Sequence, residues 1–352
     1  MVSRRTPASL FSIAGLTRLA RRAARLADTG WVRRPAVKKV AQPRSSRMPA
    51  LPPVSGLHEV TGFGTNPGGL RMLVFSPPAP PPANAPLIVV LHGCQQDAAA
   101  FARQAGWIDL ATRVGCALVL PVQVAANNAG RCFNWFRPED TKRDAGEALS
   151  IRQMVRAAQK QFGSDRRRVF IVGLSAGGAM AAAMLAAYPT VFAAGAVVAG
   201  MPVDSARSPG VALLRMGQAD VHRSAHAWAH AVRGDGAEPA QWPRLSIWQG
   251  LADDTVAPRN AENLATQWTT LHGLHDPTVQ EHVLPAGIRY RSWGRPDRPA
   301  VELWTLDGLG HGFPVDPRTP GQGSVGPYVL NARIGAAARI AAFWGIAAAG
   351  AE

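Results

Sequence analysis

A serine flanked by glycines is the first feature of this sequence that could do chemistry. The segment 173–177 reads GLSAG, follows an apolar run at 169–172 and precedes small, helix-forming residues at 179–183. A strand, a sharp turn and a helix in this order expose a serine hydroxyl at the edge of a sheet, and the glycines leave room for the turn. Ser175 is therefore predicted to be a catalytic nucleophile; the alternative is a glycine-rich turn that only packs.

An acid and a histidine follow Ser175 in the order expected for a nucleophile of this kind. Asp253 lies in the segment 250–256, GLADDTV, after an apolar run, and Asp254 is its competitor. His311 lies between two glycines after a later apolar run. A neutral imidazole can take the serine proton, and a carboxylate can hold its tautomer. We predict that His311 is the general base and Asp253 the acid that orients it; a solvated turn aspartate is the alternative.

Two backbone amides are candidates for the oxyanion hole. One belongs to Ala176, directly after the nucleophile, and the other to Cys94, in the loop after the apolar run 87–91. Such amides stabilise the negative charge that develops on a carbonyl oxygen during acyl transfer. His92 lies in the same loop, where we expect it to brace the loop rather than to take part in catalysis.

Metal and redox chemistry have little support in the sequence. Three cysteines, with no Cys-x-x-Cys pair, are too few for a disulfide framework, although one pair could form. Three histidines recur every four residues: His222, His226 and His230. We expect them to form an exposed polar stripe rather than a zinc site, and we expect neither a metal nor a cofactor.

The elements that must position these residues alternate between strand and helix. Apolar runs typical of buried strands lie at 87–91, 117–120, 169–172, 194–198, 245–248 and 301–306. Helical patterns lie at 101–114, 144–162, 178–188, 260–271 and 332–344. This alternation predicts an α/β fold with a mostly parallel central sheet and helices on both faces. A β-hairpin is expected at 57–62 and 70–76, and an irregular, cap-like insertion at about 201–243.

Length and charge indicate one catalytic domain with a basic extension. The chain has 352 residues, of which 47% are hydrophobic and 17% are charged, and no apolar run is long enough to span a membrane. Residues 1–50 hold twelve Lys and Arg residues against one acid, which accounts for +11 of the formal net charge of +15. We predict a basic N-terminal tail and linker at 1–56 and a catalytic domain at 57–352.

The tail contains a candidate amphipathic helix, because arginines at 18, 21, 22 and 25 would share one face. Such a helix would dock onto a granule or another anionic surface, whereas a basic extension without a partner is the alternative. No specific nucleic acid is expected. The tail lacks the pattern of a secretory signal, so we expect a cytoplasmic protein associated with granules. Secretion through an atypical signal is the alternative.

Taken together, these motifs resemble the polyhydroxybutyrate (PHB) depolymerase family of esterases, which belongs to the α/β-hydrolase superfamily. The resemblance covers about residues 57–346 and rests on the segments 91–96 (LHGCQQ), 132–136 (CFNWF), 168–180 (RVFIVGLSAGGAM), 250–256 (GLADDTV) and 310–312 (GHG). It implies the α/β-hydrolase fold and the hydrolysis of polymers or oligomers of short 3-hydroxy acids without a cofactor.

The resemblance also assigns residues. It places Ser175, Asp253 and His311 in the family's triad, and the amides of Cys94 and Ala176 in its oxyanion hole. It further implies that Cys94 can pair with Cys132 and that two residues, Asn134 and Trp135, line the cleft. Two features depart from the family pattern: the basic tail, which resembles the intracellular members, and Gln249, where the family commonly has His. We expect Gln249 to affect packing near Asp253 more than the mechanism.

Two other functions compete with a polyester hydrolase. Relatives with the same motifs remove feruloyl or acetyl groups from carbohydrates, so a feruloyl or acetylxylan esterase is the nearest alternative. An alternative of another class is a catalytically idle hydrolase fold that its basic tail tethers to granules or nucleic acid. The complete set of serine, histidine and aspartate argues for the enzyme.

Overall fold

The computed structural model of the protein describes residues 54–233, 239–274 and 279–346. The chain divides into two compact units, residues 1–55 and 56–352, and the fold below is that of the second unit. The basic tail with its predicted amphipathic helix lies at residues 1–53, outside the described part of the chain. Its docking therefore stays a prediction.

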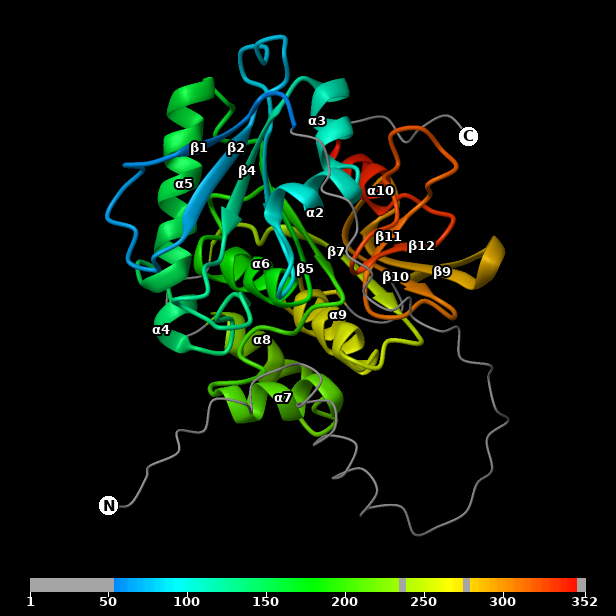
Figure 1. Ribbon diagram of the computed structural model, residues 1–352. Helices are drawn as coiled ribbons and strands as arrows, with labels where there is room; N and C mark the ends of the chain where they lie inside the picture. Colours follow the sequence, from blue (N-terminus) through cyan, green and yellow to red (C-terminus); the bar gives the residue numbers. More distant parts are fainter. Residues whose placement is uncertain (1–53, 234–238, 275–278, 347–352) are drawn as a thin grey trace, which may run out of the picture. The chain divides into compact units, whose positions relative to one another are not determined.

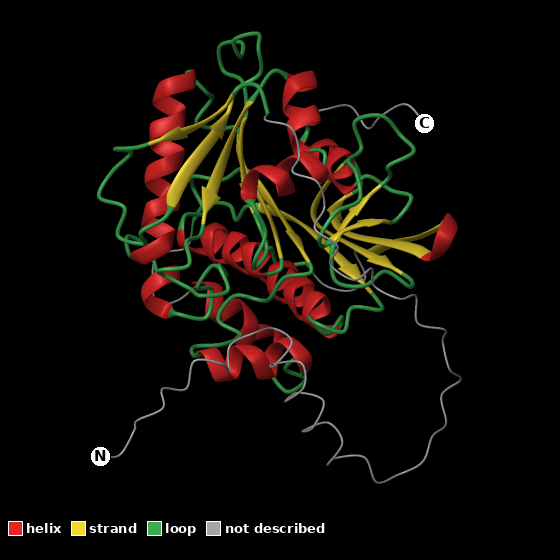
Figure 2. Cartoon of the chain, viewed as in Figure 1, coloured by secondary structure: helices red, strands yellow, loops and turns green. Residues whose placement is uncertain are grey.

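Ten strands form one sheet in the described part of this unit (Figure 2). In spatial order they are β1 (Leu57–Val60), β2 (Arg71–Phe75), β4 (Ala117–Val122), β3 (Leu87–Leu91), β5 (Val169–Leu174), β6 (Ala194–Val198), β7 (Arg244–Gly250), β10 (Arg298–Leu306), β9 (Ile288–Arg295) and β8 (Val279–Leu284). The strands from β4 to β10 are parallel, whereas β1, β2, β9 and β8 are antiparallel to their neighbours. The predicted fold is confirmed, including the hairpin of β1 and β2.

Helices cover both faces of the sheet (Figure 1). On one face lie α5 (Gly146–Phe162), α6 (Ala176–Ala187) and α9 (Arg259–Leu271), and on the other lie α2 (Ala98–Gln104), α3 (Trp107–Val114) and α10 (Ala336–Trp344). Successive strand residues point to opposite faces, so each strand supplies both layers. In β5, Ile171 joins the aliphatic core under α5 and α6, while Phe170 stacks on Trp344 of α10 with ring centroids 5.0 Å apart.

The single helix predicted for 101–114 is two helices. α2 ends before Gly106, which has a φ of 83° and separates it from α3. This left-handed conformation suits glycine and breaks the helical path. Two single turns, α4 (Pro138–Thr141) and the 3₁₀ turn η2 (Pro285–Gly287), are also present. No helix of the described ranges combines the length and the apolar character that a membrane crossing requires.

The insertion predicted at about 201–243 is partly helical, and its other described residues lie in loops. It contains α7 (Pro209–Gly217) and α8 (Ala225–Arg233). In α7 only Ala212 is buried, and the apolar residues Val211, Leu213 and Leu214 are exposed. α8 packs on α9. It includes His226 and His230 but not His222, so the three histidines do not share one helical face.

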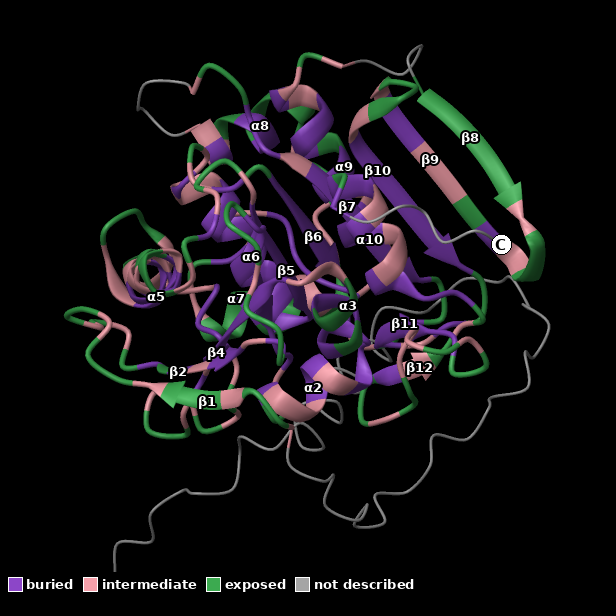
Figure 3. Ribbon diagram, turned by 90° about the horizontal axis from the view of Figure 1, so that it is seen from above, coloured by how far each residue is buried: buried purple, intermediate pink, exposed green. Residues whose placement is uncertain are grey.

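The last third of the chain holds strands that the sequence does not predict. β8 is almost entirely exposed, as Figure 3 shows, and β9 contains buried, intermediate and exposed residues. Neither strand has the continuous apolar run of a buried strand. Two further short strands, β11 (Phe313–Val315) and β12 (Val329–Asn331), pair in parallel beyond the loop that carries His311.

Candidate active site

Ser175 lies in a tight turn between β5 and α6. Its backbone has φ 57° and ψ −120°, a strained conformation, and its amide donates to the carbonyl of Val198 at 2.9 Å. A Cβ atom at Gly173 would lie 2.1 Å from the carbonyl oxygen of Gly177, and one at Gly177 would lie 2.5 Å from that of Leu91. The two glycines around the serine are therefore required by the turn.

The structure brings Ser175, His311 and Asp253 into one hydrogen-bonded chain. Nε2 of His311 lies 2.9 Å from Oγ of Ser175, and Nδ1 lies 2.8 Å from Oδ2 of Asp253. The three residues are 9%, 7% and 6% exposed. A carboxylate can only accept, so Nδ1 carries the proton and Nε2 is free to accept the serine hydroxyl. This is the geometry of an activated serine.

The environment of Asp253 explains how this carboxylate is held. Its Oδ1 accepts the amides of Thr255 at 2.9 Å and Val256 at 2.8 Å, and its Oδ2 also accepts Nε2 of Gln249 at 3.0 Å. Asp254, the competing acid in the sequence, is exposed. The geometry therefore favours Asp253.

The topology of the sheet places the candidate oxyanion hole beside Ser175. β3 and β5 are parallel neighbours, with Leu91 opposite Gly173, so the loop with Cys94 and the turn with Ser175 leave the same edge. From β3 the chain goes to β4, its neighbour on one side, and then crosses over to β5, its neighbour on the other side. In open α/β sheets, ligands bind in the crevice at the carboxyl end of a strand where the connections change side in this way. Cys94 packs in the same apolar cluster as Ala176. Ala176 opens α6, where the first amides have no helical acceptor.

His92 braces the loop that carries Cys94, as the sequence predicts. The residue is buried, and its Nε2 accepts the amide of Gln123 at 3.1 Å, so its proton must lie on Nδ1. Nδ1 donates to the carbonyl of Gly93 at 2.7 Å. That carbonyl shares a peptide plane with the amide of Cys94, so the bond fixes the direction of this amide. Burial lowers the pKa of His92 to about 4, which keeps the ring neutral.

A disulfide joins the loop after β3, which carries Cys94, to the loop at 128–135. It links Cys94 and Cys132, the pair that the family resemblance implies. Cys116, the third cysteine, is buried and free. Next to the disulfide, Trp135 packs with Ala176 in an apolar cluster. The expectation that Trp135 lines the cleft stays a prediction.

Asn134 is buried among hydrogen-bonding partners, and the expectation that it lines the cleft stays a prediction. It is 3% exposed, its Oδ1 accepts Nδ2 of Asn128 at 3.0 Å, and its amide donates to Oε2 of Glu147 at 2.9 Å. Gln123 donates to the other carboxyl oxygen of Glu147. Burial raises the pKa of Glu147 to about 8. Gln123 and Glu147 thus connect His92 with the disulfide loop, a link that no local sequence pattern indicates.

A model of the family described as esterase PHB depolymerase matches residues 70–284. The chain belongs to this family. It is 41% identical to poly(3-hydroxyalkanoate) depolymerase C of Paucimonas lemoignei over 298 residues, which cover 83% of this chain and 71% of that protein.

Carbohydrate esterases are also similar to this esterase. It is 29% identical to feruloyl esterase B of Talaromyces funiculosus, over 74% of each chain. Among solved structures, acetyl xylan esterase from Aspergillus awamori matches with a TM-score of 0.68 at 22% identity, over 83% of this chain and 99% of that one, which shows the shared fold. The protein is a carboxylic ester hydrolase with the α/β-hydrolase fold.

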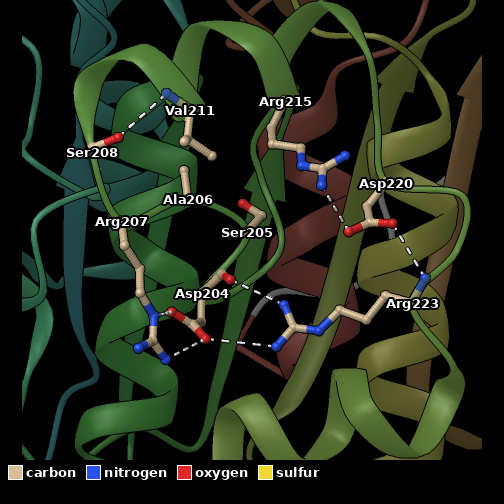
Figure 4. A pocket seen from close by; sticks show the side chains of 9 residues that line it. All are labelled: Asp204, Ser205, Ala206, Arg207, Ser208, Val211, Arg215, Asp220 and Arg223. Atoms are coloured by element: carbon tan, nitrogen blue, oxygen red, sulfur yellow. Dashed lines mark hydrogen bonds and ion pairs between the residues drawn. The ribbon is translucent and has the colours of Figure 1, made fainter.

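An open pocket of about 370 Å³ lies in the insertion of this esterase, apart from the triad residues (Figure 4). Ion pairs line it: Asp204 accepts both Arg207 and Arg223, and Asp220 pairs with Arg215. The pair of Asp204 and Arg223 joins the segment before α7 to the segment after it, and Arg215 of α7 pairs with Asp220 in the segment after it. Ala212 of α7 packs in the same apolar cluster as Ala176. Nowhere in the described ranges do three His, Cys, Asp or Glu residues gather as metal ligands.

Proposed function

We propose that this chain is a serine esterase that hydrolyses ester bonds of short-chain polyhydroxyalkanoates, as polymers or oligomers of 3-hydroxybutyrate. One observation carries the proposed mechanism: the unbroken chain of hydrogen bonds from Ser175 through His311 to Asp253. The 41% identity to the depolymerase of Paucimonas lemoignei supports the choice of substrate.

The first step forms the acyl-enzyme. Nε2 of His311 takes the proton of the Ser175 hydroxyl while Oγ attacks the carbonyl carbon of the ester. The amides of Cys94 and Ala176 donate hydrogen bonds to the oxyanion of the tetrahedral intermediate. The bond to the leaving alcohol then breaks, and His311 gives its proton to the leaving oxygen.

The second step releases the acid. Water replaces the alcohol beside His311. The imidazole takes one proton from this water while the water oxygen attacks the acyl carbon. The bond to Oγ breaks, and the proton returns from Nε2 to Ser175. Asp253 stabilises the imidazolium in both steps without taking up the proton itself.

The apolar surroundings of the serine favour a short aliphatic acyl group. Trp135, Met201 and Val256 pack around Ala176, whose amide is the proposed oxyanion donor. Apolar walls with a few directed polar groups are typical of sites for small hydrophobic ligands.

A substrate panel with the wild type and Ser175→Ala tests this proposal. We expect the wild type to hydrolyse 3-hydroxybutyrate trimer and p-nitrophenyl butyrate faster than a feruloyl ester or an acetylated xylo-oligosaccharide. Ser175→Ala should lose about a million-fold in turnover, because the triad acts as a unit. Hydrolysis that persists in the variant would refute the assignment of the nucleophile.

A carbohydrate esterase is the second candidate. The 29% identity to feruloyl esterase B of Talaromyces funiculosus and the 26% identity to acetylxylan esterase A of Aspergillus oryzae favour it. The same panel separates the two, because a carbohydrate esterase would prefer the feruloyl or acetylated substrate over the trimer.

For residues 1–50 we propose docking onto stored polymer granules in the cytoplasm. Their twelve basic residues and single acid support attraction to an anionic coat. Deletion of residues 1–50 should weaken binding to granules and anionic vesicles and leave turnover of a soluble ester unchanged. Binding that the deletion does not affect would contradict the proposal, and binding to DNA that falls steeply with salt would favour a nucleic acid instead.

A further inference from the structure

Tyr328 lies beside His311, and the proposed mechanism gives it no role. The centroid of its ring is 6.0 Å from that of the imidazole, and the two planes are nearly perpendicular, at 75°. Tyr328 is 37% exposed, whereas His311 is 7% exposed. Part of an aromatic ring therefore faces solvent next to the general base.

Hydrogen bonds on both sides hold this tyrosine in place. Its carbonyl accepts the amide of Phe313, two residues after the general base, at 2.8 Å. The preceding carbonyl, that of Pro327, accepts Nε2 of Gln96 at 2.8 Å. Oε1 of the same Gln96 accepts the amide of Gly93 in the oxyanion loop at 2.7 Å. Tyr328 thus connects the loop of the base with the loop of the oxyanion hole.

The backbone of Tyr328 is strained. Its φ is 57°, a left-handed value that is uncommon for residues with a Cβ atom and especially for bulky ones. The turn that imposes it is closed by two hydrogen bonds of 3.0 Å between Gly326 and Val329. Such strain persists only where the surrounding structure imposes it, and it is concentrated at functional sites. A glycine would fit this position better, so the side chain is kept at a conformational cost.

The position of the ring relative to His311 points to the part of the substrate that it contacts. Nε2 must come within hydrogen-bonding distance of the leaving oxygen in order to protonate it. The leaving alcohol therefore lies beside the imidazole. In a polyester, this alcohol is the next hydroxy acid unit of the chain, with an apolar side group and backbone. An exposed aromatic ring can bury such a chain.

We propose that Tyr328 is a specificity-determining residue that packs against the leaving alcohol and favours long leaving groups over short ones. This inference rests on the proposed role of His311 but not on a particular natural ester. A side chain on a backbone that hydrogen bonds hold in place loses little conformational freedom when the chain binds, which makes the contact effective.

Butyrate esters that differ only in their alcohol test the contact. Methyl, butyl and hexyl butyrate share one acyl-enzyme, and kcat/KM includes only the steps up to its formation. Tyr328→Gly removes the ring and relieves the positive φ, so the variant should still fold, which its Tm checks. We expect kcat/KM of this variant to fall about tenfold on hexyl butyrate and less than about twofold on methyl butyrate. Tyr328→Phe should retain the preference for the long ester.

Arg333→Gly is the matched control. Arg333 is exposed, has the same φ of 57° and lies five residues further along the chain, so its replacement relieves similar strain without removing an aromatic ring. It should leave the ratio of hexyl to methyl ester unchanged. If Tyr328→Gly lowers kcat/KM equally on all three esters, Tyr328 only supports His311. If it lowers kcat/KM on none of them, the ring does not contact the alcohol. Either result overturns the proposal. Failure of the wild type on hydroxybutyrate trimer would count against the proposed substrate alone.

Discussion

Gln249 donates a hydrogen bond of 3.0 Å from Nε2 to Oδ2 of Asp253. The same oxygen accepts Nδ1 of His311 at 2.8 Å, so Gln249 helps to set the position of the atom that orients the base. Gln249 is buried at the end of β7, and its Oε1 has no hydrogen-bond partner among the described residues. The side chain is therefore held here for its donor. The sequence predicts an effect of Gln249 on packing near Asp253, and the structure adds this direct contact.

Replacement of Gln249 should slow catalysis without weakening substrate binding. We expect Gln249→Leu to lower kcat about tenfold with little change in KM, because a displaced carboxylate misaligns the imidazole only during reaction. Gln249→His, which restores a donor, should recover most of kcat. Steady-state kinetics on p-nitrophenyl butyrate measure both variants. A leucine variant with the kcat of the wild type would show that the contact has no catalytic effect.

His92 should act through the amide of Cys94. Without the hydrogen bond from Nδ1 to the carbonyl of Gly93, this amide is free to turn away from the oxyanion. We expect His92→Leu to lower kcat by about tenfold to a hundredfold, less than or equal to the loss of one oxyanion donor. Affinity for a trifluoromethyl ketone should fall in parallel, because its adduct carries the same oxyanion. His222→Leu, at an exposed histidine, is the control. Unchanged ketone affinity in the His92 variant would exclude this role.

The disulfide should stabilise both the fold and the oxyanion loop. The bond closes a segment with a sequence separation of 38 residues. Its loss should lower the free energy of unfolding by about 3–4 kcal/mol. We therefore expect Cys132→Ser to have a lower Tm and a lower kcat than the wild type, and a reductant to produce both effects in the wild type but not in the variant. Cys116→Ala should respond to reductant as the wild type does. A wild type that reductant leaves unchanged would contradict this role.

Glu302 should make the stability depend on pH. Burial raises its pKa from 4.5 to about 7, although Ser246 donates to Oε1 at 2.6 Å and Arg244 and Tyr290 lie near it. Because the folded protein holds this proton more tightly than the unfolded chain, the contribution of Glu302 to the free energy of unfolding is complete at pH values below its pKa in the unfolded chain. It is lost as the pH rises through about 7.

The test is the free energy of unfolding of Glu302→Gln and the wild type, measured in urea between about pH 5 and about pH 8. As the pH rises, the free energy of unfolding of the variant should increase relative to that of the wild type by up to about 3 kcal/mol. Glu281→Gln, on the exposed strand β8, should show no such trend. Parallel curves for Glu302→Gln and the wild type would contradict the expected proton uptake.

The sequence could place the triad because each member follows a buried strand. β5, β7 and β10 are largely buried strands, and parallel strands bring the loops at their carboxyl ends to one edge of the sheet. The nucleophile has the additional signal of its glycines. The order of serine, acid and histidine along the chain then leaves few alternatives.

The supporting residues could not be found in this way. Gln249 directly follows the apolar run 245–248, and Glu147 reaches the amide of Asn134 and the side chain of Gln123, so their roles depend on contacts that no local pattern indicates. Tyr328 lies in a loop without periodicity. The helix α7, of which only Ala212 is buried, is likewise not predicted from the sequence. Polar contacts and short exposed elements leave little trace in hydrophobic patterning.

The most direct test of the central claim is to trap the acyl-enzyme. The wild type is mixed with p-nitrophenyl butyrate, quenched in acid during the burst and digested, and the peptides are analysed by mass spectrometry. We predict a butyryl group on the hydroxyl of Ser175, close to one per molecule, and no burst or adduct in His311→Ala. Steady turnover without an adduct at Ser175, or an adduct on another residue, would contradict the account.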